Sequence, residues 1–288
     1  MQGSATSFDA IAYVDEAGAL GRTSRLGSEH DDDIGLFAAV LLEGDKLAKA
    51  ADDFTPAVEL FKASAPTGSR LHITDASASG NEAWARAADS AREEAYELVR
   101  RLRIPVIFEA RRLRGQREFR DTLAEIGRKA TEGRRSGIEV KARASKERIE
   151  ENLLEMLLEK LEVYGEDARL NAIEVRFDDV DRSLFKSYEK KLDELRGTDD
   201  TMEDVMGYER ATGVLHHGTV RTQIQGASAA VRRVAGLAVA GKNDPLVLLV
   251  DIVANSLNDY FRRLDNGRDI DELSTREWCL ATGVWPKE

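Results

Sequence analysis

Apolar runs near the start of the chain predict two buried strands. The stretches "SFDAIAYVD" (7–15) and "IGLFAAVLLE" (34–43) are almost continuously apolar, which is typical of strands covered on both faces. The segment between them is rich in Gly, Ser and Asp and predicts a loop. Four further stretches are interpreted as strands or strand ends: "RLHITDAS" (70–77), "IPVIFEA" (104–110), "LNAIEVRFDD" (170–179) and "VRRVAGLAVAG" (231–241).

Stretches with the periodicity of an amphipathic helix alternate with these predicted strands. Amphipathic helices are expected over residues 46–64, 81–102, 145–165, 182–197 and 244–264. We expect a break near Pro56, an N-cap at Asn81 and a helix end at Gly165. The stretch 198–213 is acidic and shows no clear pattern. Strands that alternate with long helices predict an α/β fold.

Charge is distributed unevenly along the chain. The whole chain carries a net charge of -11, yet residues 111–148 contain thirteen Lys and Arg against six Asp and Glu. Such asymmetry indicates a surface for a polyanion, and a solvated helix face is the alternative. We place this segment in a helical insertion at about 111–165 within a single domain of residues 1–288. Its candidate nucleic-acid contacts are Arg134, Arg135, Lys141 and Arg143.

Cysteine use and hydropathy predict the compartment. The chain has one cysteine, Cys279, so an intramolecular disulfide is excluded and a reducing compartment is indicated. The opening stretch "MQGSATSFDA" has neither the basic nor the apolar region of a signal peptide. The longest apolar run, "PLVLLVDIVA", is too short for a membrane span and contains Asp251. We therefore expect a soluble cytoplasmic protein without a membrane partner.

Acidic residues stand where two predicted strands end and inside the most apolar helix. They are Asp15, Glu16, Asp178, Asp179 and Asp251. Burying an unpaired carboxylate costs several kcal/mol or shifts its pKa, so acids that converge need a cation, donors or water. Hard divalent ions such as Mg²⁺ or Mn²⁺ bind carboxylate oxygens, and an ion pair of this kind supports phosphoryl displacement. For each acid alone, a turn or a cap is the alternative.

Four short segments together resemble a known family. In chain order they are "AYVDEAG" (12–18), "RLHITDA" (70–76), "IEVRFDDVD" (173–181) and "LVLLVDIVANSLNDYFR" (246–262). They resemble motifs of the domain-of-unknown-function family numbered 3800. Ala17 stands where that family usually has Ser, and Val247 to Val250 replace its Gln-containing lead-in.

The resemblance implies a ribonuclease H-like fold, in which helices flank a mixed central sheet, and a metal-dependent nuclease activity often found near phage-defence or mobile-element genes. The ligands it implies for Mg²⁺ or Mn²⁺ are Asp15, Asp178 or Asp179, and Asp251. The same site would be lined by Glu16, His72 and Asp75. An imidazole there can ligate, orient water or move a proton, and a purely structural His72 is the alternative.

The sequence therefore predicts a divalent-metal-dependent nuclease that hydrolyses phosphodiester bonds of DNA or RNA. Nucleic acid is the expected partner, and a homo-oligomer or a defence-system partner is compatible with the chain. One alternative is a catalytically inactive protein that binds nucleic acid or another partner. A weaker one is a nucleotide hydrolase, because "GLAVAGKN" (236–243) nearly matches G-x-x-x-x-G-K-[ST] but ends in Asn243. His216 and His217 are interpreted as structural.

Overall fold

The computed structural model describes eight stretches of the chain. They are residues 8–18, 34–112, 138–139, 149–197, 201–209, 214–222, 231–241 and 243–263. The predicted nucleic-acid contacts Arg134, Arg135, Lys141 and Arg143, as well as Cys279, lie outside these residues. Within them, no helix is long and apolar enough to cross a membrane.

A five-stranded mixed sheet forms the centre of the molecule. Its strands are β1 (Ala10–Gly18), β2 (Ile34–Glu43), β3 (Val106–Arg112), β5 (Ile173–Phe177) and β8 (Val234–Val239). They lie in the order β3-β2-β1-β5-β8. β2 is antiparallel to both β1 and β3, whereas β1, β5 and β8 run parallel. The predicted α/β class, with helices around a mixed sheet, is confirmed at this level.

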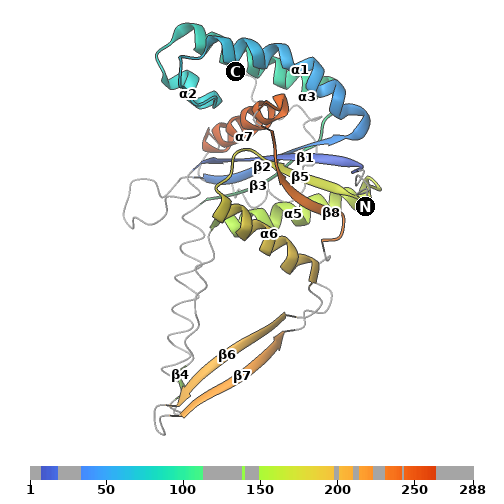
Figure 1. The fold of residues 1–288 in the computed structure, drawn as a ribbon, viewed down its shortest axis with the longest axis vertical. Helices are drawn as coiled ribbons and strands as arrows, with labels where there is room; N and C mark the ends of the chain where they lie inside the picture. The colour runs from blue at the N-terminus through green and yellow to red at the C-terminus, as the bar shows by residue number, and fades with distance from the viewer. Residues whose placement is uncertain are drawn as a thin grey trace, which may run out of the picture.

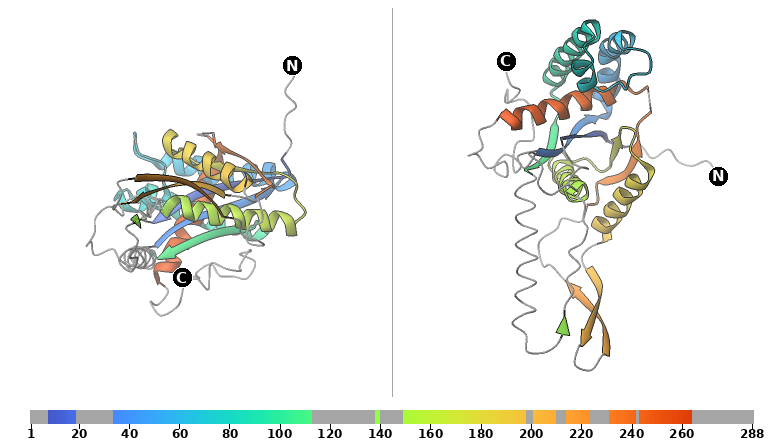
Figure 2. Two further views of the ribbon diagram at one scale, coloured as in Figure 1. Left: turned by 90° about the horizontal axis from the view of Figure 1, so that it is seen from below. Right: turned by 90° about the vertical axis from the view of Figure 1, so that its left-hand side faces the viewer.

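Helices cover both faces of this sheet (Figures 1 and 2). They are α1 (Gly44–Ser64), α3 (Glu82–Leu102), α5 (Ile149–Asp167), α6 (Arg182–Gly197) and α7 (Pro245–Arg263). α7 lies directly on one face and α1 and α3 cover it, while α5 and α6 lie on the other face. Successive residues of a strand point to opposite faces. Ile11 and Tyr13 therefore pack in the core with α7, whereas Ala12 and Val14 pack in the core with α5 and α6.

A smaller antiparallel sheet projects beyond α6 (Figure 1). It consists of β4 (Ile138–Glu139), β6 (Thr201–Glu209) and β7 (Val214–Thr222). β6 lies within the stretch for which the sequence showed no pattern, so this hairpin was not predicted. α5, which we had placed at the end of an insertion, buries Leu153, Leu157 and Leu161 against the main sheet.

Three local predictions are wrong for identifiable physical reasons. The expected strand at 70–77 is instead the short helix α2 (Ile73–Ala78), whose buried residues Ile73 and Ala76 have helical spacing. α1 continues through Pro56, because its apolar face remains buried on both sides of the missing amide donor. α5 continues through Gly165, where a Cβ atom would lie 2.9 Å from Cδ1 of Ile173, so close packing explains this glycine. The predicted N-cap is confirmed, since Asn81 accepts hydrogen bonds from two amides of α3.

Candidate functional site

Two of the predicted acids lie side by side where the parallel pairing of β1 with β5 ends. β1 itself continues past Asp15 to Gly18, paired with β2, so the prediction that this strand ends at Asp15 is wrong. The register of β1 and β5 pairs Val14 with Phe177 and ends there. Asp15 follows Val14 in β1, and Asp178 follows Phe177 at the end of β5. Both side chains are partly buried. Because Val14 and Phe177 face α5 and α6, the alternation of side chains directs Asp15 and Asp178 to the face covered by α7. The carboxyl ends of parallel strands are where α/β folds commonly bind ligands.

Asp251 of α7 is buried, with 5% of its surface exposed, and its carboxylate is held by defined donors. Its Oδ2 accepts a hydrogen bond from the backbone amide of Ile73 at 2.8 Å, and its Oδ1 accepts one from Nδ2 of Asn255 at 2.6 Å. Nδ1 of His72 lies 3.8 Å from Oδ2, which is an ion-pair distance rather than a hydrogen bond. The carboxylate is therefore oriented by two amides and an imidazole.

The charges of Asp178 and Asp251 shift the pKa values of both Asp15 and His72. The pKa of Asp15 lies well above its usual value, first because of burial and then because of the negative charges of Asp251, Glu16 and Asp178. Pairing with Asp251 raises the pKa of His72 to about 9 against the opposing effect of burial, and Asp15 and Asp178 add to the rise. We call Asp15, His72, Asp178 and Asp251 the Asp15 cluster.

Glu16 lies on the other side of the sheet from Asp15. It shares the strand face of Ala12 and Val14, which pack against α5 and α6. Its side chain is exposed, yet neighbouring protein atoms restrict its hydration and raise its pKa, and the charge of Glu150 adds to this. Glu150 is buried at the start of α5 and was missed in the sequence, where an acid in a first helical turn is unremarkable. Glu16 thus lies close enough to Glu150 for the two charges to repel each other, and it reaches the acids on the other face only through the effect of its charge on Asp15.

The remaining predicted residues lie at the margin of the cluster. Asp179 is exposed, and the charges that shift the pKa values of Asp15 and His72 include Asp178 but not Asp179. Of the two alternatives at this strand end, the geometry therefore favours Asp178. Asp75 occupies the first turn of α2 with an exposed side chain.

One face of α7 is polar. It carries Asp251, Asn255 and Asn258, at spacings that place them on one side of the helix. Oδ1 of Asn258 is buried and has no hydrogen-bond partner among the described residues. It would lie 3.4 Å from a Cβ atom at Gly18, at the far end of β1. This face of α7 thus follows β1 beyond Asp15.

The carboxylate oxygens of the Asp15 cluster are the ligand type that a hard divalent cation prefers, although they do not converge on a single position. Across the described ranges, no three Asp, Glu, His or Cys side chains are close enough together to hold a metal ion as they stand. The carboxylates of Asp15, Asp178 and Asp251 nevertheless lie on the same side of the sheet, and the charges of the other two add to the effect of burial in raising the pKa of Asp15. A cation bound between them would relieve that repulsion.

The phosphate-loop resemblance has little structural support. Gly236 lies inside β8 and pairs with Glu174 of β5, so the near-match begins within a strand rather than in a loop. Lys242 lies outside the described residues. His216 and His217 lie on β7 of the smaller sheet, which Figure 1 shows well separated from α7.

Comparisons with known proteins assign no family to this chain. No model of a known protein family matches it, and no curated protein sequence matches it at a significant level. The resemblance described from the four sequence segments therefore stays a prediction.

Proposed function

We propose that the protein is a divalent-metal-dependent nuclease with a ribonuclease H-like fold, and that the Asp15 cluster is its active site. One observation carries this proposal: Asp15 and Asp178 directly follow the last paired residues of the parallel strands β1 and β5, on the face where Asp251 is buried. The mixed sheet with helices on both faces agrees with the fold assignment. A cytoplasmic role in phage defence or in a mobile element belongs to the same proposal and derives from the sequence resemblance.

Each member of the cluster has a distinct part in this mechanism. Asp15, Asp178 and Asp251 would hold Mg²⁺ or Mn²⁺ through carboxylate oxygens, while Ile73 and Asn255 fix the orientation of Asp251. The bound ions would activate water and stabilise the charge that develops on the phosphate.

His72 is suited to the substrate side of the site. Its side chain is 44% exposed, and its pKa of about 9 keeps it protonated at neutral pH in the metal-free protein. A protonated imidazole can donate a hydrogen bond to a phosphate oxygen or a proton to the leaving oxygen. Glu16 acts on Asp15 through its charge from the other face of the sheet.

The decisive experiment compares Asp15→Asn with the matched control Asp179→Asn on labelled DNA and RNA, with Mg²⁺, Mn²⁺ or EDTA. We expect the parent to cleave one of these substrates only with metal, and Asp15→Asn to lose more than about 100-fold in rate, beyond the usual effect of residues outside the ligand sphere. Asp179→Asn should cleave like the parent. Cleavage that survives EDTA, or an Asp15→Asn variant as active as the parent, contradicts the proposal.

The alternative is a protein that binds nucleic acid or another partner without cleaving it. It is favoured by the observation that the described acids, as they stand, form no metal-holding group. Thermal unfolding with and without Mn²⁺ separates the two functions. For the nuclease, metal at about 100 times its dissociation constant stabilises the folded parent by about 2.7 kcal/mol by mass action, and Asp15→Asn abolishes this. An inactive binding protein would show no such metal effect.

A further inference from the structure

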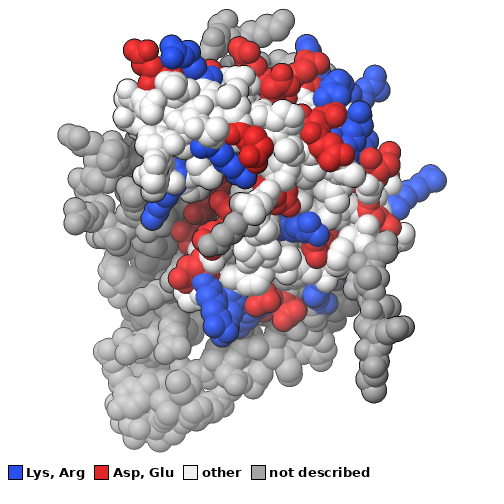
Figure 3. Space-filling view, turned by 45° about the horizontal axis from the view of Figure 1, so that its top comes forward, with Lys and Arg blue, Asp and Glu red and all other residues white. Residues whose placement is uncertain are grey.

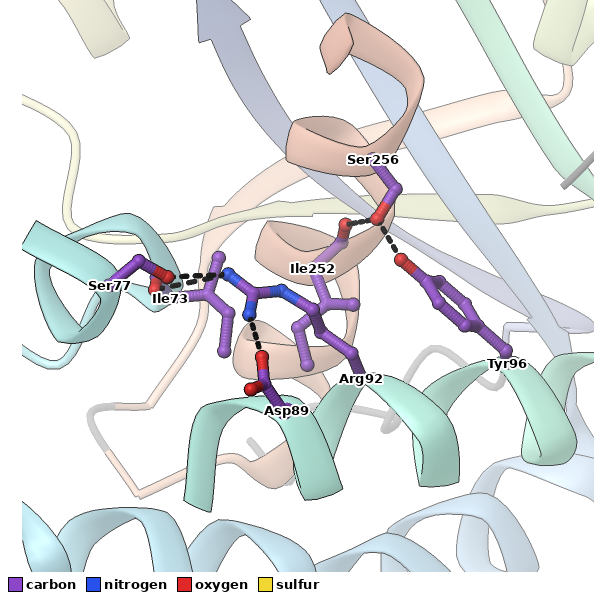
Figure 4. A network of polar contacts seen from close by, with 7 residues as sticks. All are labelled: Ile73, Ser77, Asp89, Arg92, Tyr96, Ile252 and Ser256. Carbon is purple, nitrogen blue, oxygen red and sulfur yellow. Dashed lines mark hydrogen bonds and ion pairs between the residues drawn. The ribbon is translucent and has the colours of Figure 1, made fainter. Parts of the chain in front are cut away.

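The backbone amide that binds Asp251 belongs to the short helix α2, and Arg92 of α3 bonds to that helix. Arg92 of α3 donates through Nη2 to Oγ of Ser77 at 3.1 Å and to the carbonyl oxygen of Ile73 at 3.5 Å (Figure 4). Its Nη1 donates to Asp89 at 2.7 Å, which fixes the guanidinium group on its own helix. Ile73 thus accepts a contact from Arg92 through its carbonyl and donates to Asp251 through its amide.

The same face of α3 also contacts α7. The hydroxyl of Tyr96 forms a short hydrogen bond with Oγ of Ser256, and Ser256 donates to the carbonyl oxygen of Ile252 at 2.7 Å (Figure 4). Ser256 and Ile252 lie on the helix that carries Asp251. Because Arg92 and Tyr96 are four residues apart, they project from one side of α3. α3 therefore bonds to both elements that meet at Asp251.

α3 is fixed in place by an N-cap and by a buried apolar face, so its side chains can position neighbouring elements. Its first turn is capped by Asn81, and its apolar face is buried against α1, with the Trp84 and Phe61 rings 5.6 Å apart. α2, by contrast, has only six residues and buries two of them, Ile73 and Ala76. An isolated helix of that length is unstable, so the position of α2 depends on what holds it.

We propose that Arg92 and Tyr96 are positioning residues for the Asp15 cluster. Together they hold α2 and α7 at a fixed separation, and so keep the amide of Ile73 on the carboxylate of Asp251. The inference rests on the proposed function, because it assigns these residues to the geometry of the same site. Neither residue touches the substrate in this account.

The test replaces Arg92 by Gln and compares it with Arg86→Gln. Arg86 lies on the same helix and pairs with Glu82, and both side chains are highly exposed. In EDTA, Arg92→Gln should speed hydrogen exchange of the Ile73 amide about 10-fold, while amides in the middle of α3 and α7 exchange at the parental rate. Its Mn²⁺ dissociation constant should rise about 10- to 100-fold, the range typical of residues that orient a ligand. The kcat for cleavage should fall while KM changes little.

Two further variants keep the test decisive if Arg92→Gln fails to fold. Arg92→Lys retains the charge but lacks the fork that spans Ser77 and Asp89, so it should lie between Arg92→Gln and the parent. Tyr96→Phe removes only a hydroxyl and should shift exchange and metal affinity in the same direction by a smaller factor. Arg86→Gln should match the parent in every measurement.

Two outcomes overturn the positioning role. One is parental exchange at Ile73 together with a parental Mn²⁺ dissociation constant in Arg92→Gln, or in Tyr96→Phe if the former does not fold. The other is exchange that accelerates equally in α2, α3 and α7, which would indicate a general loss of stability. Hydrogen exchange is measured without metal or substrate. A parent that neither binds Mn²⁺ nor cleaves nucleic acid would therefore reject the proposed function separately.

Discussion

Asp15 is the residue whose charge the fold accommodates least well. Its raised pKa means that the unfolded chain ionises this carboxyl more readily than the folded protein does. Above the unfolded pKa, ionisation therefore opposes folding, and the opposition grows until the pH reaches the folded pKa.

Asp15→Asn is accordingly expected to stabilise the metal-free protein. In EDTA at neutral pH, the free energy of unfolding should rise by roughly 0.5–2 kcal/mol, as for other charge changes at strained functional sites. The gain should shrink as the pH falls toward 4 and disappear below it, where the unfolded carboxyl becomes protonated. Denaturant titrations measure this, with the exposed Asp179→Asn as the control. A clear loss of stability in EDTA would show that the charge of Asp15 is satisfied by the fold.

His72 also makes the stability of the metal-free protein fall as the pH rises, but in a higher pH range than Asp15 and because its charged form is the favoured one. Its folded pKa of about 9 lies above the ordinary value of 6.5, so protonated His72 favours folding. This contribution is fully present below about pH 6.5 and is lost as the pH rises through about 9. Because the side chain is 44% exposed, we discount it to about 1 kcal/mol for solvent screening.

The matching measurement is the stability of the parent and of His72→Gln in EDTA between about pH 6 and pH 9.5. The parent should be more stable by about 1 kcal/mol at the acidic end, and the difference should vanish at the alkaline end. A difference that stays constant over this range would argue against the pairing of His72 with Asp251.

At the scale of elements, the end of β1 is held by a close approach to β2. Gly18 has a φ of 89°, and a Cβ atom there would lie 1.8 Å from the carbonyl oxygen of Ile34. Gly68 has a similar φ of 83° but nothing within 4 Å of the corresponding position. The two glycines share the unusual φ and differ in the steric contact.

Gly18→Ala should therefore cost more than Gly68→Ala. The left-handed conformation costs a residue with a side chain roughly 1–2 kcal/mol, which applies to both variants. The clash with Ile34 should add about 1–3 kcal/mol for Gly18→Ala alone, as overpacking does elsewhere. Chemical denaturation of both variants measures the difference. Equal losses would mean that β1 and β2 separate at this end without cost.

At the scale of the whole molecule, the candidate site is acidic, whereas the candidate nucleic-acid contacts belong to a basic stretch of the sequence. Figure 3 shows Asp and Glu side chains gathered in a hollow of the described surface, with Lys and Arg interspersed around it. A surface of this kind does not attract a polyanion by itself. The excess of Lys and Arg in residues 111–148, most of which lie outside the described ranges, is therefore the expected source of phosphate contacts.

Binding to nucleic acid should depend on salt through this segment. Replacement of Arg134, Arg135, Lys141 and Arg143 by Ala should flatten the slope of log affinity against log salt by up to ~3–4, because each duplex phosphate contact contributes about 0.9. Replacement of the exposed Arg86 and Arg100 of α3 by Ala provides the control and should leave the slope unchanged. An unchanged slope in the first variant would show that its charges only solvate the surface.

Elements with a clear local pattern of apolar and polar residues could be predicted from the sequence. Continuous apolar runs defined β1, β2 and β3, helical periodicity defined α3 and α7, and Asn81 marked a helix start. These signals are local, because the period of a strand or helix is a property of its own backbone. The sequence also placed an acid directly after β5, since a polar residue after an apolar run can be recognised from neighbours alone. It placed the end of β1 too early, because β1 continues from Asp15 to Gly18.

Which of the acidic residues lie close together in space could not be predicted from the sequence and follows from the tertiary structure. Asp15 and Glu16 are adjacent in sequence but lie on opposite faces of the sheet, and the register with β5 brings Asp178 beside Asp15. The hydrogen bond between the amide of Ile73 and the carboxylate of Asp251 joins residues 178 positions apart. Such contacts depend on strand register and on how the helical layers stack, and no local periodicity encodes either of them.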